Sequence, residues 1–108
     1  MKISKVDEYT KGWIIGNFQP SEFNNPHVEV SVKFFKAGET EPEHYQIVAT
    51  EITVVHSGEI LLGNQTFSAG DVITIAPGEI AGFESLTDSS LTCIKFPSLP
   101  NDKVLANE

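Results

Sequence analysis

The chain has 108 residues, of which 40% are hydrophobic and 20% charged, and this suits one globular domain rather than two. Its net charge is −8, from 15 acidic and 7 basic residues, so nucleic acids and anionic membrane surfaces would be repelled on average and are not expected as partners. No apolar run approaches the roughly 18 residues of a membrane span, and residues 1–8 are too polar for an export signal, so we expect a soluble cytoplasmic protein.

The first quarter of the chain predicts one short strand between irregular segments. Residues 1–12 are polar with scattered apolar positions, which allow a short strand or an N-terminal arm, and periodicity does not decide between them. The apolar run that follows predicts a strand, in which Trp13 is expected to pack in the core or against a second copy rather than on a ligand. Residues 19–27 contain two prolines and predict a loop.

Residues 28–35 alternate in the way that is typical of a half-buried strand. One face carries three valines and Phe34, and the other carries three polar residues and Phe35. Phe35 is expected to point outward. Because outward apolar residues such as Phe35, together with Trp13, favour self-association, the sequence predicts a homodimer.

From residue 59 onward, short β-branched segments alternate with turn signals, which predicts an all-β sandwich or barrel. Gly63 and Asn64 predict a tight hairpin, because glycine supplies the positive φ that such a turn needs. The tail, residues 97–108, is expected to run irregularly over the surface. Further strands are expected at residues 72–75, 80–86 and 91–96.

Two glycine-bounded stretches contain the candidate site. The first, residues 38–58, contains His44, Gln46 and Glu51. A turn at residues 47–50 would make this stretch a hairpin-like unit, from which the three side chains could converge. The second stretch, residues 70–81, combines two glycines with a proline and ends on alanine.

The first stretch resembles the first motif of the cupin family. Gly38, His44, Glu51 and Gly58 match that motif in residue type and spacing, whereas Gln46 stands where the family has a second histidine.

The second stretch resembles the second cupin motif. Gly70 and Gly78 match it, the proline is displaced by one position to Pro77, and Ala81 replaces a histidine. The resemblance implies a small, single-domain, RmlC-like cupin over residues 1–108, whose two sheets form a double-stranded β-helix, or jelly roll, around a pocket.

The resemblance also implies a site with altered chemistry. Cupins usually bind a divalent metal through three histidines and one glutamate, and here only His44 and Glu51 remain of that set. The amide oxygen of Gln46 is a poor ligand for a transition metal and Ala81 offers none, so the implied metal set of His44, Gln46 and Glu51 would bind weakly. The alternative is a hydrogen-bonded polar pair of His44 and Glu51 without a metal.

Two functions are therefore open. The first is a binding module whose pocket, lined by His44, Gln46, Glu51 and Ala81, holds a small polar ligand such as a sugar. The second is a cupin-type enzyme, either metal-dependent with an incomplete ligand set or a metal-free isomerase or epimerase that uses His44 as acid or base. Resemblance to a fold with many functions does not choose between them.

Three other sets of residues are expected to be structural. Cys93 lies in an apolar run and is expected to be a buried thiol, and as the single cysteine it cannot form an internal disulfide. His56 lies one position out of phase with Glu51 along the predicted strand, so it should point away from the pocket. The acidic cluster at residues 39–43 is expected to be a solvated loop rather than an attractor for cations or amines.

Overall fold

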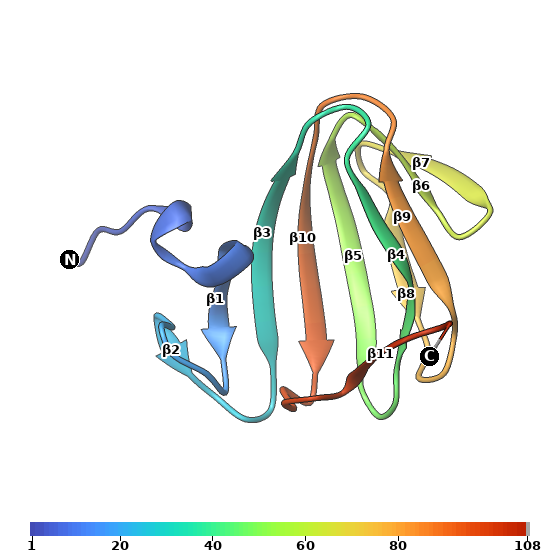
Figure 1. The fold of residues 1–108 in the computed structure, drawn as a ribbon. Helices are drawn as coiled ribbons and strands as arrows, with labels where there is room; N and C mark the ends of the chain where they lie inside the picture. The colour runs from blue at the N-terminus through green and yellow to red at the C-terminus, as the bar shows by residue number, and fades with distance from the viewer. Residues whose placement is uncertain (108) are drawn as a thin grey trace.

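The computed structural model describes residues 1–107, which form two β-sheets packed face to face with a short arm at one side (Figure 1). The first sheet contains β1 (Trp13–Gly16), β2 (Phe23–Asn24), β3 (Glu29–Phe35), β5 (Thr50–Ser57), β8 (Val72–Ile75) and β10 (Ser89–Phe96). The second contains β4 (Thr40–Gln46), β6 (Glu59–Leu62), β7 (Gln65–Ser68), β9 (Ala81–Ser85) and β11 (Lys103–Leu105).

The strand order is β2-β1-β3-β10-β5-β8 in the first sheet and β11-β4-β9-β6-β7 in the second. The pairings are antiparallel except for that of β1 with β2. Chain neighbours often lie in different sheets, as β4 and β5 do, so the chain crosses repeatedly between the two layers. The predicted all-β class is confirmed, as is the hairpin at Gly63 and Asn64, which joins β6 to β7.

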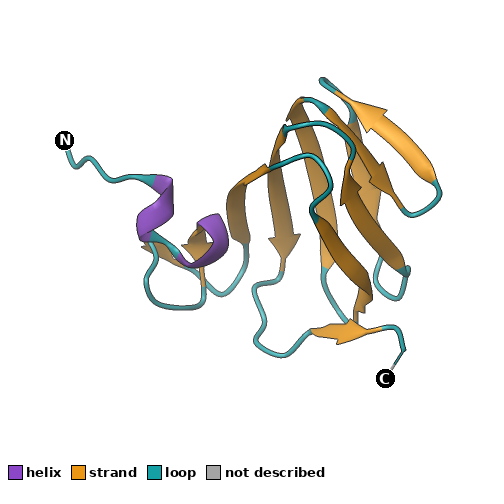
Figure 2. Ribbon diagram, turned by 45° about the horizontal axis from the view of Figure 1, so that its top comes forward, coloured by secondary structure: helices purple, strands orange, loops and turns teal. Residues whose placement is uncertain are grey.

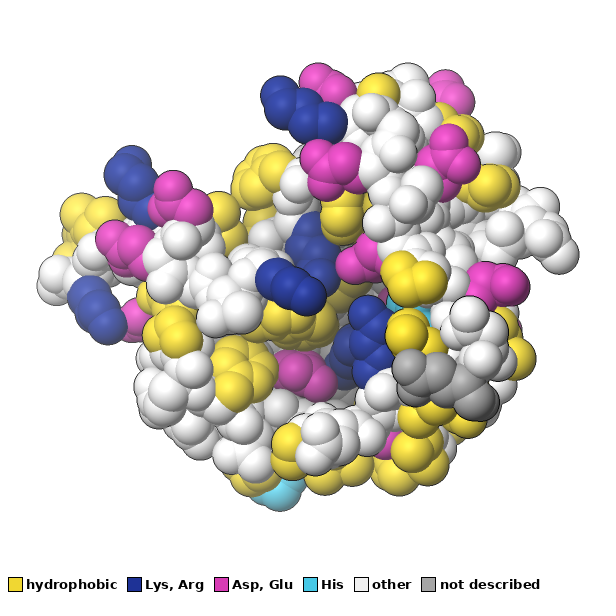
Figure 3. All heavy atoms as spheres, in the orientation of Figure 1, with side chains coloured by type: hydrophobic (Ala, Val, Ile, Leu, Met, Phe, Trp, Pro, Cys, Tyr) yellow, Lys and Arg dark blue, Asp and Glu magenta, His cyan; other side chains and the backbone are white. Residues whose placement is uncertain are grey.

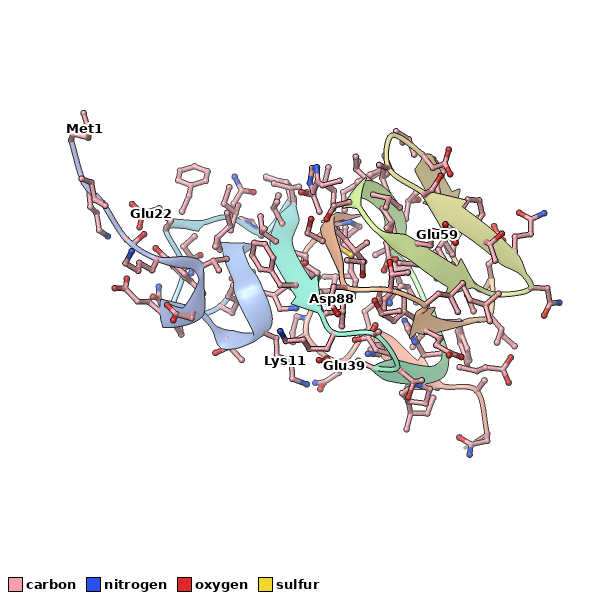
Figure 4. The ribbon with its side chains drawn as sticks, turned by 90° about the horizontal axis from the view of Figure 1, so that it is seen from above. Met1, Lys11, Glu22, Glu39, Glu59 and Asp88 are labelled. Atoms are coloured by element: carbon pink, nitrogen blue, oxygen red, sulfur yellow. The ribbon has the colours of Figure 1, made fainter. Side chains whose placement is uncertain are left out.

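The N-terminal arm contains two short 3-10 helices, η1 (Val6–Glu8) and η2 (Thr10–Gly12), which lie beside the sheets (Figure 2). Met1 lies at the far end of this arm, beyond Glu22 (Figure 4). The arm is held by Glu22, whose Oε2 accepts hydrogen bonds of 2.9 Å from both Lys2 Nζ and the Tyr9 hydroxyl.

The motif glycines are explained by backbone geometry. Gly38, Gly58, Gly70 and Gly78 all have positive φ, between 81° and 95°. At Gly58 a Cβ atom would also lie 2.2 Å from the carbonyl oxygen of Asp88, so no other residue fits there. These positions match the motif because they are turns between strands.

The prediction that Phe35 points outward from β3 was wrong. The Phe35 ring points inward and packs against Phe83, with a centroid separation of 4.5 Å. Ser31 is completely buried on the same face, whereas Phe34 is 67% exposed on the other. The alternation of residues in β3 favoured its valine face as the inward one. The other face points inward because the interior that it lines is partly polar.

The C-terminal tail is also more ordered than the sequence predicted. It forms β11, in which Lys103 pairs with Gln46 of β4. Just before β11, the carboxylate of Asp102 accepts hydrogen bonds of 2.9 Å from the backbone N–H groups of Val48 and Ala49. The tail therefore closes the turn between β4 and β5, and the prediction of an irregular tail was wrong because this pairing joins segments distant in sequence.

The apolar core occupies one end of the space between the sheets. Val55, Ile60, Phe83 and Leu91 form its buried centre. Along β10 the inward residues then change from Leu91 to a charged position, Lys95. Within residues 1–107, no helix is long and apolar enough to cross a membrane.

Candidate functional site

A cavity of about 300 Å³ lies between the sheets, beside the apolar core. Strands of both sheets and the segment before β11 contribute to its wall. Figure 3 shows a hollow on this face, with lysine, carboxylate and apolar side chains gathered around it. The cavity is small for a ligand site, since such pockets commonly run from about 300 to 1,000 Å³.

The structure places all four predicted site residues on the wall of this cavity. His44 and Gln46 project from the same face of β4, and Ala81 on β9 lies directly opposite His44. Glu51 reaches the cavity from β5 in the other sheet. The predicted turn at residues 47–50 separates the two strands and allows this convergence.

A β-bulge in β4 brings in a residue that the sequence analysis assigned elsewhere. Glu41 pairs with Phe83 and His44 pairs with Ala81, so β4 advances three residues while β9 advances two. The extra residue restores Glu41 to the inward face. Glu41 therefore lines the cavity, contrary to the expectation of a solvated loop, whereas the other two glutamates of the acidic cluster are exposed.

The Gln46 side chain is the least accessible polar group of the predicted site. It is only 5% exposed, and its Nε2 has no hydrogen-bond partner within residues 1–107. Its backbone is held in place, because the Gln46 carbonyl oxygen accepts a 2.8 Å hydrogen bond from the N–H of Gly78. A buried N–H group without a partner costs roughly 1–3 kcal/mol, so this amide calls for an acceptor from outside the chain.

The tautomer of His44 follows from its hydrogen bond. Its Nδ1 lies 2.9 Å from the carbonyl oxygen of Pro42, which can only accept. Nδ1 therefore carries the proton, and Nε2 of the neutral ring keeps a lone pair.

Four of the chain's seven basic residues line the cavity, and the sequence analysis did not identify them. They are Lys11, Lys33, Lys95 and Lys103. A signal was present in Lys33 and Lys95, which interrupt otherwise apolar or small-residue strands, but the inward face of those strands was not known.

Trp13 lies among these lysines. The Lys33 Nζ is 5.1 Å and the Lys95 Nζ 5.0 Å from the centroid of its ring, within cation–π range. Trp13 therefore lines the cavity with charged neighbours, rather than packing in the apolar core.

Carboxylates lie beside the lysines without forming ion pairs. In the register of the first sheet, Lys95 lies between Glu29 and Glu51. Nevertheless, among residues 1–107 the one ion pair within 4 Å joins Lys2 to Glu22, outside the cavity. The lysines of the cavity are therefore not held in ion pairs by its carboxylates.

Burial shifts the pKa of two charged residues at the cavity. It raises the pKa of the Glu29 carboxyl, and the Glu51 carboxylate raises it further while Lys95 opposes the shift. Burial lowers the pKa of Lys103, and repulsion from the other three cavity lysines lowers it further against the attraction of Glu41. The lysines are therefore near enough to repel one another.

Cys93 is a buried thiol, as predicted. It is 9% exposed, and its Sγ lies 3.7 Å from Thr53 Oγ1. Burial raises the pKa of the Cys93 thiol, and the Glu51 carboxylate adds to the effect, so the reactive thiolate is disfavoured.

His56 lies outside the cavity, as its phase predicted. It is the extra residue of a bulge in β5, and its Nε2 lies 2.6 Å from Thr92 Oγ1. It is exposed and is not available as a replacement ligand at the cavity.

The residues of the cavity do not fit a cupin-type metal centre. Within the described part of the chain, no group of three or more His, Cys, Asp and Glu side chains is arranged to hold a metal ion. Ala81 has no ligand atom, and Gln46 has an unpartnered N–H donor. The set of His44, Gln46 and Glu51 remains a prediction for metal titration to test.

Comparisons with solved structures identify the fold. A double-stranded β-helix protein from Klebsiella pneumoniae matches over 99% of this chain and 93% of its own, with a TM-score of 0.72 and 21% identity. An RmlC-like cupin from Shewanella frigidimarina matches over 68% of each chain, with a TM-score of 0.61 and 19% identity. The chain has the cupin fold that its two motifs predicted.

The DMSP lyase DddQ from Ruegeria pomeroyi also has this fold. The match covers 87% of this chain but 49% of the lyase, with a TM-score of 0.69 and 20% identity. No protein-family model matches the sequence, and no curated protein is similar to it. At these identities the structural matches show a shared fold and leave the activity to be argued from the site.

Proposed function

We propose that this protein binds a small polar molecule, such as a sugar or a molecule of similar size, in the cavity between its sheets. The observation that supports this proposal most directly is the Gln46 Nε2, an N–H donor that is buried at the cavity wall without a partner. A ligand oxygen would satisfy it, and His44 and Glu51 supply further polar groups at the same wall. A few polar groups in a partly apolar pocket are typical of small-molecule sites.

Trp13 provides a direct test, because it is the only tryptophan and it lines the cavity. We expect a panel of sugars, polyols and small organic acids to contain a compound that shifts the Trp13 indole and Gln46 amide signals in NMR titrations. Gln46→Leu should weaken its binding by roughly tenfold, because one buried hydrogen bond is lost. Gln65→Leu is the matched control, since Gln65 is exposed on β7. A panel with no binder, or one binding only on the outer surface, would contradict the proposal.

A second candidate function is a metal-free isomerase or epimerase, and the tautomer of His44 favours it. Because Nδ1 is held by the Pro42 carbonyl, the Nε2 lone pair can accept a proton from a bound substrate. In D₂O, an enzyme of this type should exchange a carbon-bound hydrogen of its ligand for deuterium, and His44→Gln should abolish the exchange while binding persists. A ligand recovered without deuterium after long incubation would contradict the isomerase or epimerase function, and binding would be the only function that is supported.

A further inference from the structure

We infer that the ligand of this cavity is a small hydroxycarboxylate, with its carboxylate held by Lys33, Lys95 and Lys103 and its hydroxyl groups by the neighbouring glutamates. This inference rests on the proposed binding function and specifies its ligand. The first argument is that positive charge is concentrated at one place in an acidic protein. The chain has a net charge of −8, yet four of its seven basic residues line one cavity.

The second argument is that these lysines have no carboxylate partners. Lys33 and Lys95 lie 5.1 and 5.0 Å from the Trp13 centroid, and no carboxylate among residues 1–107 approaches either within 4 Å. Gathering like charges at a partly buried site costs free energy that a bound anion would recover. Five carboxyl groups also line the cavity, so an anion would recover this cost only where it contacts the lysines directly.

The third argument is the arrangement on the other wall. Lys103 pairs with Gln46 across β11 and β4, so an ammonium group and the unpartnered, 95% buried amide project from adjacent positions of the same face. A carboxylate has two oxygens, and one can accept from each group. Gln46 thus becomes a neutral donor in an anion site, which also explains why it would serve poorly as a metal ligand.

The carboxylates of the cavity limit the charge of the ligand. Two of them are already engaged with the backbone, because Asp102 accepts from Val48 and Ala49, and Glu79 accepts from Ala76 at 2.9 Å. The other three, Glu29, Glu41 and Glu51, can accept from hydroxyl groups but would repel a dianion. One carboxylate carrying hydroxyl groups matches this balance better than a phosphate does.

Gluconate and sorbitol are suitable probes, because they differ at one carbon, which is a carboxylate in gluconate and a hydroxymethyl group in sorbitol. We expect calorimetric titration to show gluconate binding at least about tenfold more tightly than sorbitol, a difference of about 1.4 kcal/mol. Glucose 6-phosphate tests the dianion and should bind more weakly than gluconate.

Lysine variants test which residues cause the preference for gluconate over sorbitol. Lys95→Met and Lys103→Met should each reduce gluconate affinity by roughly tenfold or more and leave that of sorbitol nearly unchanged, since methionine keeps the length and removes the charge. Lys36→Met is the matched control, because Lys36 is exposed and outside the cavity. If a variant does not fold, the comparison of gluconate with sorbitol in the wild type still tests the proposed carboxylate site.

The outcomes separate this inference from the proposed function. Equal binding of gluconate and sorbitol, or binding only of neutral members of the wider panel, would overturn the carboxylate site and leave small-molecule binding intact. Tighter binding of glucose 6-phosphate than of gluconate would assign the lysines to a phosphate. No binding by any compound in either experiment would overturn both.

Discussion

At the scale of single residues, Gln46 and Ala81 decide what the site can bind. They occupy the positions where the two cupin motifs would place histidines, and the backbone already directs them to one wall. Gln46 shares a face of β4 with His44, and Ala81 lies opposite His44 on β9. Their side chains, rather than their positions, set this cavity apart from a metal centre.

Restoring the two histidines should therefore create a metal site. With His44 and Glu51, the double variant Gln46→His/Ala81→His would present three imidazoles and one carboxylate. We expect its affinity for Ni²⁺ or Zn²⁺ to exceed that of the wild type by more than about tenfold for each added ligand, about 1.4 kcal/mol each. Calorimetric titration of the wild type, both single variants and the double variant measures this gain, and each single variant should gain less.

Two outcomes would contradict this view of the site. A double variant that binds no better than the wild type would show that residues 46 and 81 do not converge with His44. A wild type that already binds as tightly would show that the cavity is a working metal centre with ligands beyond those described above.

At the scale of elements, the segment before β11 holds the end of the barrel together. Asp102 is 8% exposed and accepts two backbone hydrogen bonds from the turn between β4 and β5, while its own carbonyl oxygen accepts a third from Ile47 at 2.9 Å. These bonds fix the turn that separates Gln46 from Glu51. They also place Lys103 at the cavity wall.

Asp102→Ala should lower the free energy of unfolding by about 2–3 kcal/mol, because two backbone N–H groups lose their acceptor at a largely buried site. Urea denaturation measures the change. The matched control is Asp88→Ala, since the Asp88 carboxylate accepts a single 2.9 Å hydrogen bond, from the exposed Ala37 N–H. The control should lose about 1 kcal/mol or less. Equal losses of unfolding free energy in the two variants would show that the Asp102 hydrogen bonds stabilise the fold no more than the single exposed hydrogen bond of Asp88.

At the scale of the whole molecule, the outer face of the first sheet is an extended apolar surface. Val30, Ile94 and Ile52 lie side by side across β3, β10 and β5, and Phe34 and Val72 on this face are 67% and 65% exposed. The homodimer predicted from the sequence therefore has a different candidate surface. Phe35 and Trp13, on which the prediction was based, both face the interior.

We expect a homodimer that buries at least about 1,000 Å² through this outer face. Analytical ultracentrifugation at micromolar concentration should show a dimer for the wild type and a shift to monomer for Phe34→Asp, because the substitution buries a charge in the interface. Ile47→Asp is the matched control, since Ile47 is 56% exposed and lies on the turn between β4 and β5, outside the strands of this sheet. A wild-type monomer would contradict the prediction.

The sequence by itself determined the features that depend on neighbouring residues. Glycines with positive φ and β-branched segments specify turns and strands locally, so the all-β class and the hairpin at residues 63–64 were predicted correctly. The motif spacing placed His44, Gln46, Glu51 and Ala81 at one cavity, because that spacing reflects which strand positions face inward in this fold.

The tertiary structure alone decided the features that depend on distant pairing. The more polar face of β3 points inward because the inner surface of the first sheet is partly charged. Alternation shows that β3 has two different faces, but it does not show which of them faces the interior. The bulge that turns Glu41 inward depends on the pairing of β4 with β9, and Lys103 comes beside Gln46 through the pairing of β11 with β4. Both pairings join segments that are far apart in the chain. The four cavity lysines could not be identified from the sequence, because they become neighbours only when η2, β3, β10 and β11 are assembled around the cavity.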